Sequence, residues 1–131
     1  MEKPLQVLVV SCNAETRRTL SGVLRDLPVR AHLFSSVAQA RHFVATRHVD
    51  MVFCEELLFD GSYKQLLGAL RVARPDAQFV LVMRNGEWAE YLEALRLGVE
   101  NVLRPPLLPI DIDLVFIHSF RHSAFELAAH A

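Results

Sequence analysis

The sequence predicts an α/β fold: a three-layer sandwich in which a parallel five-stranded sheet of order 2-1-3-4-5 lies between two layers of helices. Short aliphatic runs alternate five times with longer amphipathic segments. This alternation is typical of a parallel sheet with helices on both faces. A length of 131 residues is common for one domain. We expect the domain to span residues 1–125, with 126–131 as a tail or the start of a linker.

The first half of the chain contains three expected strands, at 5–10, 29–34 and 50–54, each rich in aliphatic or β-branched residues. Two helices are expected between them. Asn13 is a good N-cap for the first helix, and Ser36, with Gln39 three residues later, is a capping-box pattern for the second.

In the second half, a turn at 60–62 precedes a helix whose apolar side is predicted to hold Leu66, Leu67, Leu70 and Val72. Further strands are expected at 78–83 and 99–103. The helix between them, at 87–97, ends at Gly98, a typical left-handed C-cap. The last helix is expected from about Ile110 past Phe120, with an apolar face of Ile110, Leu114, Ile117 and Phe120.

The carboxyl ends of the strands are where this sheet topology builds a functional crevice. The residues expected there are Ser11, Cys12, Glu55, Glu56, Met83, Arg84, Arg104 and Pro105.

Three stretches carry a resemblance to a known family. They are the first strand followed by Arg17, Arg18 and Leu20, the segment from Asp50 to Glu55, and the segment from Leu97 to Leu103. Together they resemble the receiver domain of bacterial two-component response regulators over nearly the whole chain. The resemblance implies a flavodoxin-like fold.

The chain departs from the family at each member of its catalytic set. The resemblance places Ser11 and Cys12 where receivers carry two acidic Mg²⁺ ligands, and Glu55 at the phosphoacceptor Asp. It places Met83 at the Thr or Ser that contacts the phosphoryl group, and Pro105 at the Lys. Mg²⁺ prefers carboxylate and other oxygen ligands. We therefore expect a degenerate phosphorylation pocket, a pseudo-receiver, with no catalytic residue, metal or cofactor.

For Glu55 and for the two cysteines, the sequence allows two interpretations each. Glu55 is expected to be a partly solvated carboxylate, or alternatively to pair with Arg84 and lock one state. Cys12 and Cys54 are expected to be structural thiols, or alternatively a redox pair at the ends of neighbouring strands. His118 and His122 have helical i, i+4 spacing, but the rest of a zinc signature is missing.

The resemblance also implies an interaction face, formed by the helix at 87–97, the strand at 99–103 and the last helix. Val102 stands where receivers carry an aromatic residue. With Leu92 and Leu95 toward the core, Trp88, Tyr91 and Val102 would point to this face. Exposed aromatic residues are enriched at the centres of protein interfaces. The alternative is that Trp88 and Tyr91 only cover the rim of the core.

These observations predict a phosphorylation-independent interaction module in bacterial signal transduction or transcriptional regulation. It would form a homodimer or bind a protein partner, and an effector domain could follow in a longer chain. The alternatives are a small-molecule sensor using the crevice and an atypical phosphoacceptor using Glu55.

A net charge of -1 argues against direct nucleic-acid binding, and no apolar run is long enough for a membrane span. Two cysteines and the lack of a leader-like N-terminus favour the cytoplasm.

Overall fold

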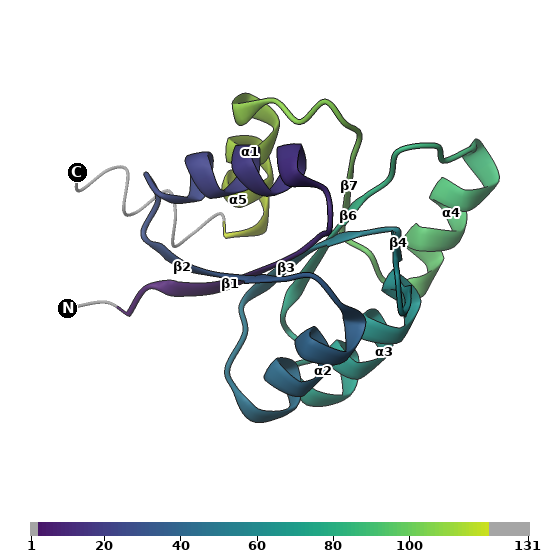
Figure 1. The fold of residues 1–131 in the computed structure, drawn as a ribbon, viewed down its shortest axis with the longest axis horizontal. Helices are drawn as coiled ribbons and strands as arrows, with labels where there is room; N and C mark the ends of the chain where they lie inside the picture. The colour runs from purple at the N-terminus through teal and green to yellow at the C-terminus, as the bar shows by residue number, and fades with distance from the viewer. Residues whose placement is uncertain (1–2, 121–131) are drawn as a thin grey trace.

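Five parallel strands form the central sheet of the computed structural model, which describes residues 3–120 (Figure 1). Their order is β2-β1-β3-β6-β7, which is the predicted 2-1-3-4-5 arrangement. The strands are β1 (Leu5–Val10), β2 (Val29–Phe34), β3 (Met51–Glu55), β6 (Gln78–Val82) and β7 (Asn101–Leu103). The strands β1, β3 and β6 are buried on both faces for most of their length, as their aliphatic runs predict.

Helices cover both faces of the sheet and complete the three layers (Figure 1). One face packs against α1 (Ala14–Leu24) and α5 (Pro109–Ser119). The other face packs against α2 (Val37–Thr46), α3 (Tyr63–Ala73) and α4 (Trp88–Leu97). The α/β sandwich predicted from the alternating pattern is thus confirmed.

Side-chain caps begin and end several helices where the sequence predicts them. Asn13 accepts a hydrogen bond from the Thr16 amide, and Ser36 accepts one from the Gln39 amide. Gly98 ends α4 at a φ of 104°, which is in the left-handed region that favours glycine. The segment predicted as a turn contains a small antiparallel hairpin, formed by β4 (Leu57–Leu58) and β5 (Gly61–Ser62).

The apolar face predicted for the last helix is wrong. Ile110, Leu114 and Ile117 are each more than half exposed, whereas the buried residues of α5 are Ile112, Val115 and Phe116. This helix carries aliphatic residues on all sides, so periodicity alone does not identify the buried one. Packing against Phe53 and the other residues of the α1 side selects the face that includes Phe116.

Several further aliphatic side chains lie outside the core. Val72 on α3 is exposed, although it is predicted on the apolar side of its helix, and Leu33 near the end of the edge strand β2 is also exposed. On α4, Leu95 is exposed and Ala94 is the buried residue, so the prediction that Leu95 faces the core is wrong. A small side chain lets the helix lie close to the sheet, and the bulky neighbour is left in solvent.

Within residues 3–120, no helix combines the length and the apolar character needed to cross a membrane. The predicted continuation of the last helix beyond Phe120, the residue His122 and the expected tail at 126–131 lie outside the described residues.

Candidate functional site

The carboxyl ends of the strands bring the predicted pocket residues to one edge of the sheet. Ser11 directly follows β1, Glu55 is the last residue of β3, and Met83 directly follows β6. The register pairs Glu55 with Val82, so that Met83 lies one residue beyond Glu55 at this edge. The parallel topology therefore gathers side chains that are far apart in the sequence.

The carboxylate of Glu55 is buried, and one of its oxygens has two partners. Ser11 Oγ donates a hydrogen bond to Glu55 Oε1 at 2.9 Å, and Arg84 Nη2 lies 2.7 Å from the same oxygen. Only 6% of the residue is exposed. The expectation of a partly solvated carboxylate is therefore wrong, and the alternative pairing with Arg84 is the one observed. The physical reason is that the loop after β6 places the Arg84 guanidinium within hydrogen-bond distance of Glu55.

Arg84 also connects the pocket to the first helix. Its Nη2 donates to Thr16 Oγ1 at 2.6 Å, so one guanidinium nitrogen joins β3 and α1. Thr16 is buried although it is polar. We did not single out Thr16 from the sequence. The signal that could have found it is its place three residues after the N-cap Asn13, on the first helical turn beside the crevice.

A second arginine fixes the segment that carries Ser11. Arg17 Nη1 donates to the carbonyl oxygens of Ser11 at 2.8 Å and Phe34 at 3.3 Å. The amide of Asn13 donates to Ser11 Oγ at 3.0 Å. The Ser11 hydroxyl thus accepts from the backbone and donates to Glu55, which holds it in one orientation.

The other two predicted pocket residues make no polar contact with Glu55. Met83 is buried and packs against Gly86, and Pro105 is half-buried at the cis peptide bond between Pro105 and Pro106. These two side chains contribute apolar surface at the edge of the pocket.

The donor set of this pocket does not fit a magnesium ion. The site offers one carboxylate, Glu55, and that group already accepts from Arg84 and Ser11. Its neighbour Cys12 carries a thiol, which is a poor ligand for a hard cation that prefers oxygen donors. Among residues 3–120, no three His, Cys, Asp or Glu side chains are grouped to hold a metal ion.

The two cysteines lie in different environments. Cys54 is fully buried in the core on the α2–α3 side of the sheet, and this burial strongly raises the pKa of its thiol. Cys12 is exposed and donates a hydrogen bond to the Ser35 carbonyl oxygen at 2.9 Å. Both are free thiols. A buried thiol of raised pKa is a poor nucleophile, which favours a structural role for Cys54.

The hairpin after β3 is tied to the second helix. The two carboxylate oxygens of Asp60 accept from the amides of Val37, at 2.8 Å, and Ala38, at 3.0 Å. These backbone hydrogen bonds lower the pKa of Asp60. Burial and the nearby Glu90 raise the pKa of Glu56, the residue that follows β3. The hairpin is therefore anchored at the N-terminus of α2, where a negative charge is favourable.

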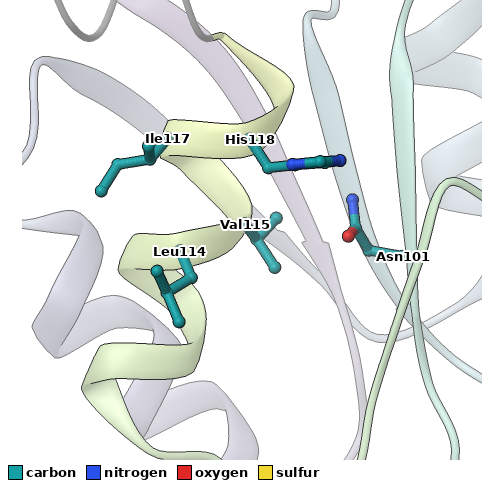
Figure 2. Close-up of a pocket in the computed structure, with 5 residues that line it drawn as sticks. All are labelled: Asn101, Leu114, Val115, Ile117 and His118. Atoms are coloured by element: carbon teal, nitrogen blue, oxygen red, sulfur yellow. The ribbon is translucent and has the colours of Figure 1, made fainter.

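The predicted interaction residues have unequal exposure. Trp88 is 70% exposed and stacks on Tyr91, with 5.5 Å between ring centroids. Tyr91 is half-buried, and Val102 packs partly against the core under α4. The sequence did not identify the exposed residues of α5. Leu114 and Ile117 form, with Val115, His118 and Asn101, the lining of a shallow groove between α5 and β7. Figure 2 shows the Asn101 and His118 side chains directed toward each other across this groove.

A scan against models of protein families finds no match, and neither does a comparison with curated proteins. Solved structures do match, and those compared below are receiver domains. The receiver domain of a putative LuxO repressor protein from Vibrio parahaemolyticus superposes with a TM-score of 0.84 at 13% identity, covering 98% of each chain.

Two further structures agree. A CheY-like receiver domain from Methanospirillum hungatei JF-1 has a TM-score of 0.83 at 13% identity, covering 94% of this chain and 98% of that one. The receiver domain of an HD domain-containing protein from Pseudomonas fluorescens Pf-5 has a TM-score of 0.81 at 21% identity, covering 91% and 96%. The chain therefore has the fold of response regulator receiver domains, as its sequence resemblance predicts.

Proposed function

We propose that this domain is a receiver-like protein–protein interaction module of bacterial signal transduction or transcriptional regulation, which acts without phosphorylation. Its partner is a second copy of the domain or another protein, and it works in the cytoplasm without binding nucleic acid directly. An effector domain attached in a longer chain fits the same proposal. The receiver fold supports the signalling context.

The observation that carries the proposal is the exposed apolar surface of α5. Ile110, Leu114 and Ile117 are spaced at i, i+4 and i+7, which places them along one side of the helix. Each is more than half exposed. Burying such a stripe against a partner is favourable at roughly 25 cal/mol per Å² of apolar surface.

One feature beside the stripe supports an interaction at this face. On the other side of the edge strand β7, α4 exposes Trp88, a residue type enriched at the energetic centres of interfaces.

The state of the pocket supports independence from phosphorylation. Glu55 is paired with Arg84, and the site lacks the oxygen ligands that Mg²⁺ requires. Phosphoryl transfer depends on positioning and charge neutralisation by such groups. A phosphoacceptor role for Glu55 has no support from this geometry.

Sedimentation equilibrium across a wide concentration range tests the interaction. We expect the protein to self-associate and Ile117→Glu to weaken association by more than about tenfold. The matched control is Val72→Glu, which places the same charge at an exposed aliphatic position on α3. If self-association is absent, affinity capture with the wild type and both variants tests a separate partner. Equal behaviour of the two variants in both experiments would contradict the proposed face.

Amide NMR spectroscopy tests the independence from phosphorylation. We expect the signals of Ser11, Glu55 and Met83 to stay in place when millimolar Mg²⁺ is added, and again when beryllofluoride is added with it. Saturable shifts at these residues would show that the pocket retains metal-dependent chemistry.

The small-molecule sensor remains a second candidate, because a hollow opens on the other side of Arg84. Its lining combines apolar surface from two prolines and a leucine with polar side chains, a carboxylate and a guanidinium: Asn13, Glu15, Thr16, Thr19, Arg84, Pro105, Pro106 and Leu107. A thermal-shift screen of small carboxylates and phosphates would support this candidate if one of them raised the melting temperature.

A further inference from the structure

The loop between β6 and α4 is held in place by two arginine side chains and by one close contact within the loop. Arg84 reaches down to Glu55 and Thr16. Gly86 lies so close to Met83 that a Cβ atom on the glycine would be 1.7 Å from the methionine sulfur. From the other side, Arg104 Nη2 donates to the Gly86 carbonyl oxygen at 2.8 Å. The loop that leads directly into Trp88 is therefore fixed by contacts to several parts of the sheet edge.

The ion pair is the strongest of these contacts. Among the described residues, Arg84 is the only cation paired with Glu55. The carboxylate is buried, so losing Arg84 would leave its charge uncompensated and largely out of reach of water. The buried carboxylate of Glu55 thus keeps Arg84 in position, and Arg84 in turn keeps the loop between β6 and α4 in position.

We propose that the Glu55–Arg84 ion pair is a permanent internal latch, which fixes the loop at 83–87 and the start of α4 so that Trp88 is presented in one position. Three residues separate Arg84 from Trp88 along the chain, and Trp88 stacks on Tyr91 one turn later. The cation that neutralises the pocket carboxylate comes from the chain itself, so the arrangement needs no added ligand. This inference deepens the proposed function, and the biological role of the latch rests on that function. The latch itself is tested separately, by measurements on the loop.

The chain contains a single tryptophan, so its fluorescence reports on this part of the molecule alone. Acrylamide quenching measures access to Trp88, and amide hydrogen exchange followed by mass spectrometry measures opening of residues 84–91. The test variants are Glu55→Gln, which removes the negative charge with little change in size, and Arg84→Gln, which removes the guanidinium and shortens the side chain. The matched control is Glu93→Gln. It neutralises a carboxylate on α4, the helix that carries Trp88, and breaks the exposed ion pair of Glu93 with Lys64.

We expect exchange at residues 84–91 to accelerate by roughly tenfold or more in both latch variants, while strands β1 and β3 keep their protection. Quenching of Trp88 should rise in parallel. Glu93→Gln should change neither quantity by more than about twofold, because exposed ion pairs contribute little. Arg84→Lys should restore part of the protection, since lysine can pair with Glu55 but lacks the guanidinium fork.

Exchange rates within about twofold of wild type in both latch variants would overturn the proposal. So would loss of protection spread evenly over the whole domain, since that result means global destabilisation. If Glu55→Gln fails to fold, Arg84→Gln decides, because a released loop with intact strands supports the latch and an unchanged loop overturns it.

The outcome for the latch is independent of the outcome for the interaction face. A protein that stays monomeric and captures no partner, but shows a released loop in the variants, retains the latch and loses the proposed function. A protein that self-associates through α5, with no change in loop exchange, retains the proposed function and loses the latch.

Discussion

Breaking the pocket ion pair from its two ends is expected to have unequal effects on stability. The side chain of Glu55 is 8% exposed and that of Arg84 is 37% exposed. Arg84→Met leaves a buried carboxylate whose remaining contact is the hydroxyl of Ser11. Glu55→Met leaves a guanidinium that can turn toward water. The first change should therefore destabilise the domain more than the second.

The exposed fractions of the two side chains determine how much the losses of stability in the two single variants should differ. Removing one partner from a buried ion pair costs about 3–5 kcal/mol. Because Arg84 is more than a third exposed, water takes up part of this loss, and we expect about 2–3 kcal/mol for Arg84→Met. For Glu55→Met we expect about 0–1 kcal/mol, since Arg84 regains hydration. The double variant should resemble Glu55→Met, because it leaves no carboxylate unpaired.

Urea unfolding at neutral pH, followed by far-ultraviolet circular dichroism, measures all four proteins of this cycle. The comparison requires that the free energy of unfolding falls equally steeply with urea concentration in all four proteins. Two results would refute the reasoning. One is an equal loss, within about 0.5 kcal/mol, for the two single variants, and the other is a double variant as unstable as Arg84→Met.

Two further predictions concern the hairpin anchor and α5. The lowered pKa of Asp60 means that its native state binds fewer protons than the unfolded chain, so its contribution is present at neutral pH and is lost as pH falls through the lowered pKa. Asp60→Asn should lower the urea midpoint at neutral pH and flatten its decline below about pH 4, and an unchanged acid profile would contradict the anchor. On α5, Ile112→Ala should cost about 2–5 kcal/mol of unfolding free energy, whereas Ile110→Ala should stay within about 0.5 kcal/mol. Similar losses at these positions would mean that the buried side of α5 is assigned wrongly.

Much of the fold is predictable from the sequence because its signals are local. A strand buried on both faces must be apolar at successive positions, and Val7 to Val10 meet that requirement without reference to other residues. Caps are equally local, since Asn13 and Ser36 each bond to an amide three residues later. The gathering of Ser11, Glu55 and Met83 at one edge follows from the sheet topology.

The pocket contacts are less predictable because they depend on side-chain direction. Glu55 and Arg84 are 29 positions apart, and the sequence allowed either a solvated or a paired carboxylate. The loop backbone determines that Arg84 turns inward rather than toward solvent. Thr16 enters the same contacts only because α1 packs beside that loop.

The sequence by itself determined the α/β class, the strand order and the residues of the pocket at the strand ends, since these depend on local patterns and general rules of topology. Only the tertiary structure decided which side of α5 is buried, which residue of α4 touches the sheet and where the charge of Glu55 is neutralised. A helix that is apolar on all sides can pack in several orientations, and a buried charge can take any cation within reach. The neighbouring elements select one arrangement from these, and those contacts are not encoded in any short segment.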